Sequence, residues 1–195
     1  MTNCILAGVG GQGTVLASKL IAGTAIREGC FARTAETIGM AQRGGCVVSH
    51  VRIGEDAYSP ILPLHCADLL IGFEPAEAVR CLPYLKKGGA VVANTKAIKP
   101  VTASLSGDGY DGAVMIEYLK ARVSRLTLID GDAVCSQCGS PKVLNVALLG
   151  AACAAGALPF SLQALEAALM EMLAPKFIEV NRKALELGAL AAGGE

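Results

Sequence analysis

The residues that could bind a ligand begin with a glycine-rich turn near the N-terminus, in the segment CILAGVGGQG at residues 4–13. Gly8, Gly10 and Gly13 fit the pattern G-x-G-x-x-G, which links a first strand to a helix in nucleotide-binding βαβ units. Backbone N–H groups at the start of that helix, here near Thr14, would face an anion at the positive end of the helix dipole. The same glycines also suit a tight turn that binds nothing. The pattern therefore predicts either a phosphate-binding turn or a packing turn.

A dinucleotide site of the NAD type would also need an acidic residue about 20 positions after the glycines, to bind the ribose hydroxyls. Glu36 is near that place, but we expect it to follow a short strand over residues 30–35. Arg33 could instead suit a phosphate. Neither position matches the dinucleotide pattern, which weakens the reading of the chain as a dehydrogenase.

A second candidate binding segment is the loop at residues 39–45, in which glycines flank Arg43. A guanidinium recognises a carboxylate or a phosphate through two parallel hydrogen bonds, although a surface arginine in a loop is the alternative. In the strand that follows, His50 and Arg52 alternate with apolar residues, as in a strand with one polar face. We therefore predict that residues 46–53 form an edge or partner-facing strand.

Other chemically suggestive residues carry weaker signals. His50 and His65 are the only histidines, and neither has a neighbour in the spacing of a catalytic triad or a metal site. Cys135 and Cys138 form a lone C-x-x-C, which cannot supply the four ligands of a zinc or iron–sulfur site. The two cysteines are therefore expected either to pack in the protein or to form a redox dithiol. Residues 107–109 resemble the start of a thiamine-diphosphate motif, but the required Asn pair is absent and we predict a turn.

Strands and helices alternate along the chain, which predicts an α/β fold with a doubly wound, mostly parallel sheet. We expect Gly29 and Gly88-Gly89 to end the first two helices, and Ile26 to face the core. The carboxyl ends of parallel strands share one edge, so Asn94-Thr95 and Glu74 should lie beside the Gly8 turn. The expected helices span residues 14–28, 75–85, 111–124, 143–155, 161–173 and 176–190. The expected later strands span residues 68–73, 90–94 and 126–130.

Composition limits the possible classes of protein. The 195 residues suggest one domain, with 53% apolar and only 17% charged residues, against about 25% charged in typical domains. The apolar stretch at 143–160 is alanine-rich and contains Asn145, so we predict a helix buried in protein and no membrane span. The apolar excess then points to a subunit interface. Zero net charge disfavours nucleic acid, and eight scattered cysteines without a visible signal peptide indicate the cytoplasm.

Several of these segments in combination resemble the gamma-type domain of 2-oxoacid:ferredoxin oxidoreductases. The similarity is greatest to the small (beta) subunit of the indolepyruvate type, and it covers nearly the whole chain. Cys135 and Cys138 are not part of the pattern. The segments that carry the resemblance are Gly8–Gly13, Gln42–Gly45, Ser49–Arg52, Ala67-Asp68, Phe73–Pro75, Gly88-Gly89, Asn94-Thr95, Asn145–Gly150 and Val180–Ala184.

The resemblance implies an α/β, Rossmann-like domain over residues 1–195, with a C-terminal helical part at about 141–192, that is one subunit of a larger enzyme. Such enzymes decarboxylate a 2-oxo acid on thiamine diphosphate, pass electrons through iron–sulfur (4Fe–4S) clusters to ferredoxin, and transfer the acyl group to coenzyme A. The large (alpha) subunit would hold thiamine diphosphate, Mg²⁺ and the clusters.

No catalytic residue is expected in this chain, which would be inactive alone and could form a homodimer. The residues expected to bind the shared coenzyme A are Gly8, Gly10, Gly11, Gln12, Gly13, Gln42, Arg43, Gly44, Gly45, Asn94 and Thr95. Two other functions remain open: a self-sufficient NAD(P)- or flavin-binding oxidoreductase, and a non-enzymatic nucleotide-binding assembly module.

Overall fold

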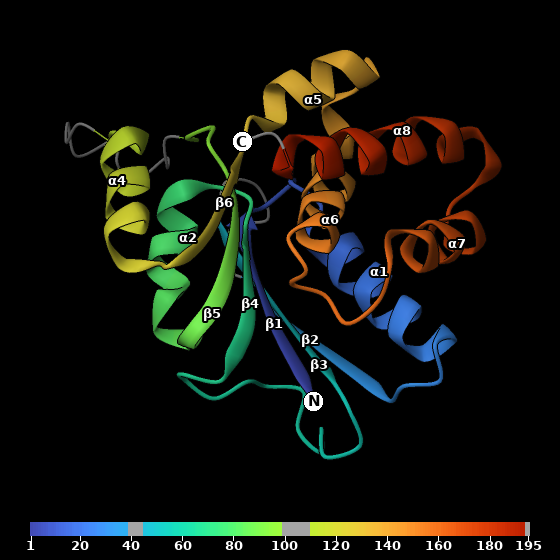
Figure 1. The fold of residues 1–195 in the computed structure, drawn as a ribbon, viewed down its shortest axis with the longest axis horizontal. Helices are drawn as coiled ribbons and strands as arrows, with labels where there is room; N and C mark the ends of the chain where they lie inside the picture. Colours follow the sequence, from blue (N-terminus) through green and yellow to red (C-terminus); the bar gives the residue numbers. More distant parts are fainter. Residues whose placement is uncertain (39–44, 99–109, 194–195) are drawn as a thin grey trace.

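A six-stranded sheet with helices on both faces forms the fold (Figure 1). The computed structural model describes residues 1–38, 45–98 and 110–193. The strands are β1 (Thr2–Val9), β2 (Ala32–Ile38), β3 (Cys46–Ile53), β4 (Ala67–Gly72), β5 (Leu85–Asn94) and β6 (Arg125–Ile129). The helices are α1 (Thr14–Arg27), α2 (Pro75–Cys81), α4 (Gly112–Arg122), α5 (Gly131–Cys138), α6 (Leu144–Ala154), α7 (Leu162–Met172) and α8 (Pro175–Ala192), with 3-10 turns at Leu82–Tyr84 and Pro141–Val143.

The strand order is β2-β3-β1-β4-β5-β6, and β1, β4, β5 and β6 run parallel. This confirms the α/β class and the mostly parallel sheet. The prediction that residues 46–53 form an edge strand is wrong, because β3 lies antiparallel between β1 and β2. His50 is buried there, where its Nδ1 accepts a hydrogen bond from the Leu62 N–H at 3.2 Å and its ring meets Tyr84 edge-on. His50, on the polar face of β3, thus has its partners inside the protein.

Two apolar layers hold the helices to the sheet. On one face, α1, α6, α7 and α8 pack on strand residues such as Leu6 and Val92. On the other face, α2 and α4 cover the alternate residues, such as Ile5 and Val91. Successive residues of β1 and β4 are thus buried on opposite faces, which gives nearly continuous burial along strands that are covered on both sides.

The apolar segment at 143–160 contains a short helix, α6, which is buried from Asn145 to Ala152. It crosses α8 so closely that a Cβ on Gly188 would lie 2.0 Å from the carbonyl oxygen of Ala147. A Cβ on Gly150 would lie 2.1 Å from the Leu185 carbonyl oxygen. Within the described ranges, no helix is both long and apolar enough to cross a membrane. The expectation of a helix buried in protein is confirmed.

Some element boundaries differ from those expected. Gly29 does end α1, with a left-handed φ of +77° and the Cys30 N–H bonded to the Ala25 carbonyl at 2.8 Å. Gly88-Gly89, in contrast, ends no helix: α2 stops at Cys81, and β5 already begins at Leu85. A Cβ on Gly89 would lie 3.0 Å from the Ala67 carbonyl oxygen, so the glycine lets two strands approach. Ile26, expected in the core, is exposed.

Candidate functional site

The carboxyl ends of the parallel strands and the N-termini of α1 and α5 meet around a cavity of about 470 Å³. Open α/β sheets bind ligands at this edge. Three segments that are distant in the sequence line the cavity: the turn Gly11–Gly13, the residues just after β5, and the region around α5 and the start of α6. Parallel strands bring these ends together, which places the glycine turn at the predicted rim.

Gln12 determines the shape of the glycine turn. Its side-chain oxygen accepts a hydrogen bond from the Val9 N–H at 2.8 Å, and its amide donates to the Phe73 carbonyl at 3.0 Å. A Cβ on Gly8 would lie 2.8 Å from both Gln12 Oε1 and Phe73 Cβ. Gly8 is therefore required by the packing of the turn against the end of β4, whether or not a phosphate binds here.

Gly13 places the start of α1 against the cavity. It has a left-handed φ of +82°, and a Cβ there would lie 2.8 Å from Asn145 Nδ2. Gly13 is the N-cap residue of α1, and among the described residues no side chain caps this helix N-terminus. The first N–H groups of α1 thus lack a side-chain acceptor at the wall of the cavity, where an anion could bind them.

The second candidate loop reaches the same place from β3. The Gly10 N–H donates to the Gly45 carbonyl at 2.8 Å, so the end of this loop touches the glycine turn. Gln42, Arg43 and Gly44 lie outside the described residues. Their predicted role in binding stays a prediction.

Asn94 and Thr95 lie at the end of β5, as expected. Asn94 is buried, donates to the Phe73 carbonyl at 3.3 Å and accepts from the Gly131 N–H at 3.0 Å. The Thr95 N–H donates to the Ile129 carbonyl at 3.0 Å. Asn94 therefore lines the cavity with its polar atoms already engaged, while Thr95 lies outside the lining.

A buried carboxylate braces the neighbouring part of the rim. Glu74 caps α2 by accepting from the Glu77 N–H at 3.0 Å, and it also accepts from the Ile98 N–H at 3.3 Å and from the Tyr110 hydroxyl. Burial and the Glu74 carboxylate raise the pKa of Tyr110, which keeps its hydroxyl protonated as a donor. Glu74 thus holds two chain segments in place at the end of β4.

The cationic residues that line the cavity were not predicted from the sequence. Lys96 and Lys142 both line it, together with Asp132. Asp132 pairs with Lys96 at 2.6 Å, and this hydrogen bond raises the pKa of Lys96. Extending the rim two residues past Asn94 would have found Lys96. Lys142 approaches the turn only through the packing of α5 and α6, for which the sequence has no local signal.

Glu36 is unsuited to bind the ribose of a dinucleotide. It lies inside β2, not beyond it, and its carboxylate accepts from Ser18 Oγ at 3.2 Å. In addition, β3 separates β2 from the strand that carries the glycine turn. The classical arrangement requires an acid beside that turn.

The two cysteines of the C-x-x-C lie in the last turn of helix α5, which ends at Cys138, and both are free thiols. Burial raises the pKa of both thiols, which lowers the fraction of reactive thiolate. Among residues 1–38, 45–98 and 110–193, no group of three or more His, Cys, Asp or Glu side chains could hold a metal ion. The polar residues that line the described cavity are those of the glycine turn with Asn94, Lys96, Asp132 and Lys142.

Comparison with known proteins identifies the family. The family model for pyruvate ferredoxin/flavodoxin oxidoreductase matches residues 3–191. The chain belongs to this family. Indolepyruvate oxidoreductase subunit IorB of Thermococcus kodakarensis is 36% identical over 97% of this chain and 95% of its own length. The pyruvate/ketoisovalerate oxidoreductases common subunit gamma of the same organism is 27% identical over 92% of this chain and 90% of its own length.

The fold agrees with this membership. A keto/oxoacid ferredoxin oxidoreductase gamma subunit from Geobacter sulfurreducens superposes with a TM-score of 0.71 at 25% identity, covering 98% of both chains. Membership of the pyruvate ferredoxin/flavodoxin oxidoreductase family thus confirms the resemblance found in the sequence, and with it the expectation of an oxidoreductase subunit. Nothing in the structure or these comparisons supports a self-sufficient dehydrogenase.

Proposed function

We propose that this chain is the small subunit of a 2-oxoacid:ferredoxin oxidoreductase that acts on indolepyruvate or a related aryl pyruvate. The observation that carries the proposal is the difference in similarity to two subunits of one organism. The chain is 36% identical to the indolepyruvate subunit but 27% identical to the gamma subunit shared by pyruvate and ketoisovalerate enzymes. The reaction would convert the 2-oxo acid and coenzyme A into acyl-coenzyme A and carbon dioxide, while ferredoxin is reduced.

We assign thiamine diphosphate, Mg²⁺ and the iron–sulfur clusters to the large (alpha) subunit. Iron–sulfur clusters require several Cys thiolates around one site. The cysteines of this chain are spread from β1 to α6, and burial raises the pKa of Cys4 and Cys153 to about 12. Such thiols suit packing rather than metal binding, which supports placing the redox groups in the partner.

We assign to this chain part of the coenzyme A site, at the rim cavity. Coenzyme A carries phosphates, and the cavity offers the N-terminus of α1, which has Gly13 as its N-cap, together with Lys96 and Lys142. The Gly8–Gly13 turn would border the phosphate through Gly11–Gly13, since the N–H groups of Val9, Gly10 and Gln12 are bonded within the protein. The Gln42–Gly45 loop would contribute from beside Gly10. Asn94 would shape the pocket wall, and Thr95, outside the lining, would hold the end of β5 beside β6 through its N–H. This arrangement would bind and orient a phosphate of coenzyme A.

The complex would work in the cytoplasm, where eight thiols without disulfides are stable. Ferredoxin would be reached through the large subunit.

Co-expression with the chain encoded beside it tests the proposal. We expect a stable complex with iron and thiamine diphosphate in the large chain, which reduces ferredoxin or a viologen dye when a 2-oxo acid and coenzyme A are added. Neither chain alone should do so. A purified complex that reduces no acceptor with any 2-oxo acid, or tight NAD(P) binding by this chain alone, would contradict the proposal.

A further inference from the structure

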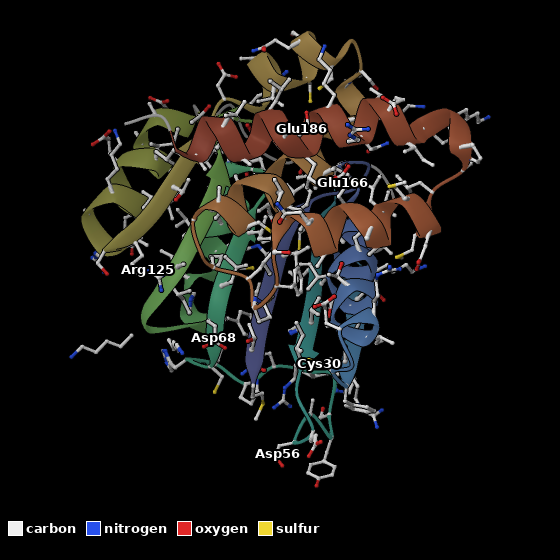
Figure 2. The ribbon with its side chains drawn as sticks, turned by 45° about the vertical axis from the view of Figure 1, so that its right-hand side comes forward. Cys30, Asp56, Asp68, Arg125, Glu166 and Glu186 are labelled. Atoms are coloured by element: carbon white, nitrogen blue, oxygen red, sulfur yellow. The ribbon has the colours of Figure 1, made fainter. Side chains whose placement is uncertain are left out.

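The C-terminal helices α6, α7 and α8 form one closely connected unit. At the crossing of α6 and α8, a Cβ on Gly150 or on Gly188 would lie 2.1 or 2.0 Å from a carbonyl oxygen of the other helix. Glu166 of α7 and Glu186 of α8 lie near each other, and Arg182 Nε pairs with both carboxylates, at 3.1 and 3.5 Å (Figure 2). The contact that places this unit against the glycine turn therefore also places the residues that the unit contributes to the rim cavity.

The segment that leads into α6 supplies the part of the cavity wall that comes from this unit. Pro141, Lys142 and Leu144 line the cavity. Asn145 is the next residue, in the first turn of α6, and it is buried. The residues that follow it, 146–152, are buried and apolar. Burial of a side-chain amide costs free energy unless its hydrogen bonds are made, so the partners of Asn145 decide what it does here.

Asn145 contacts the glycine turn at Gly13, the N-cap residue of α1. Its Oδ1 accepts a hydrogen bond from the Val146 N–H at 3.0 Å, and its Nδ2 donates to the Gly13 carbonyl at 3.4 Å. With its oxygen engaged at Val146, the amide turns its nitrogen towards Gly13. A Cβ on Gly13 would lie 2.8 Å from this nitrogen, so the two residues are in close contact. The start of α6 therefore rests directly on the start of α1.

A second side-chain bond joins the C-terminal helices to α1, but it lies far from the cavity. Arg27, in the last turn of α1, pairs with Glu171 of α7. Both side chains are exposed, and exposed ion pairs contribute little to stability. Among residues 1–38, 45–98 and 110–193, Asn145 makes the one side-chain hydrogen bond that connects the C-terminal helices to the turn at the cavity.

We propose that Asn145 is a positioning residue for the phosphate that binds at the rim. It holds Lys142, three residues earlier, opposite the first N–H groups of α1, so that one phosphate contacts both. Asn145 lies outside the lining of the cavity and acts through these two groups. This inference rests on the proposed function, because the phosphate is that of the coenzyme A assigned to this site.

A double-mutant cycle in the assembled complex tests the inference. Calorimetry would give the Kd for coenzyme A of the parent complex, Asn145→Ala, Lys142→Ala and the double variant. We expect each single change to raise the Kd about five- to tenfold, and the double variant to exceed either one by no more than about twofold, since both changes remove the same contact. The KM for the 2-oxo acid should stay unchanged. Independent effects would instead multiply, to about 25- to 100-fold.

Asn181→Ala is the matched control for the loss of a buried amide. Asn181 is also a buried asparagine of the C-terminal helices, and its Nδ2 donates to the Phe177 carbonyl at 2.8 Å within α8. Thermal unfolding should show that both alanine variants are less stable than the parent, whereas only Asn145→Ala should raise the Kd. If Asn145→Ala does not fold, Asn145→Leu, which nearly keeps the side-chain volume without the amide, takes its place with the same expectation.

The outcomes separate this inference from the proposed function. In an active complex, an unchanged Kd for either single variant, or effects that multiply in the double variant, would overturn the inference alone. Equal effects of Asn145→Ala and Asn181→Ala on the Kd would also overturn it, because lost stability would then explain both. A complex that binds no coenzyme A, or that reduces no acceptor with any 2-oxo acid, would overturn the proposed function first.

Discussion

The side-chain amide of Gln12 donates to the Phe73 carbonyl at 3.0 Å and so ties the first βα turn to the end of β4. The same side chain accepts from the Val9 N–H at 2.8 Å. Gln12, which lies within the glycine motif, thus connects the end of β1 to the residue that follows β4. The absence of a Cβ at Gly8 leaves the space that Gln12 and Phe73 need.

Replacing Gln12 tests this structural role. Gln12→Ala removes both hydrogen bonds, and we expect it to lower the free energy of unfolding by about 1–3 kcal/mol. Gln12→Glu keeps the acceptor for Val9 but turns a carboxylate towards the Phe73 carbonyl, so it should also destabilise. Urea unfolding measures both. If both variants were as stable as the parent chain, the tie between turn and sheet would be unimportant.

The contact between α6 and α8 should be intolerant of a single methyl group. Gly188→Ala places a Cβ 2.0 Å from the Ala147 carbonyl oxygen, and we expect a destabilisation of about 1–3 kcal/mol or more despite alanine's better helix propensity. Gly193→Ala, at the end of the same helix, meets nothing closer than 3.9 Å and is the control. Thermal unfolding compares the two. Equal stability of both variants would show that the helices can separate without cost.

Protonation of His50 should destabilise the fold. Burial lowers the pKa of His50 below the usual 6.5, and its Nδ1 accepts from Leu62. The unfolded chain then binds the proton more readily, so this contribution to stability is complete above pH 6.5 and is lost as the pH falls towards the lower folded pKa. His50→Gln should flatten that part of the pH–stability curve. Parallel curves for variant and parent would argue against it.

Lys142 should contribute to coenzyme A binding in the assembled enzyme. Lys142→Ala removes a cation from the rim cavity, and we expect the KM for coenzyme A to rise about five- to tenfold with little change in kcat, as for one charge-assisted hydrogen bond near solvent. Lys176→Ala, on α8, is the control. An unchanged KM for Lys142→Ala would move the phosphates away from this cavity.

The main elements of the fold could be predicted from the sequence, because each depends on residues that are close together in the chain. The glycine turn, the end of α1 at Gly29 and the alternation of strands and helices all follow from backbone geometry or burial. The position of β3 inside the sheet could not be predicted in this way. From the sequence alone His50 resembles a solvent-facing residue, and only the structure shows that Leu62 and Tyr84 contact it.

The site could be predicted only in part for the same reason. The rim position of Gly11–Gly13 and Asn94 follows from the sheet topology, but their engagement with Phe73 and Gly131 depends on side-chain packing. Lys142 is far along the chain from the turn, and no spacing rule relates them. Resemblance to the family assigned an oxidoreductase subunit, while the residues alone left a dinucleotide site open.

The substrate preference of the complex tests the central claim most directly. We would measure ferredoxin reduction by the purified complex with indolepyruvate, phenylpyruvate, pyruvate and 2-ketoisovalerate at saturating coenzyme A. The account predicts the highest kcat/KM for the aryl pyruvates and no reduction when either chain is omitted. Equal or greater kcat/KM for pyruvate or 2-ketoisovalerate, or full activity without this chain, would contradict it.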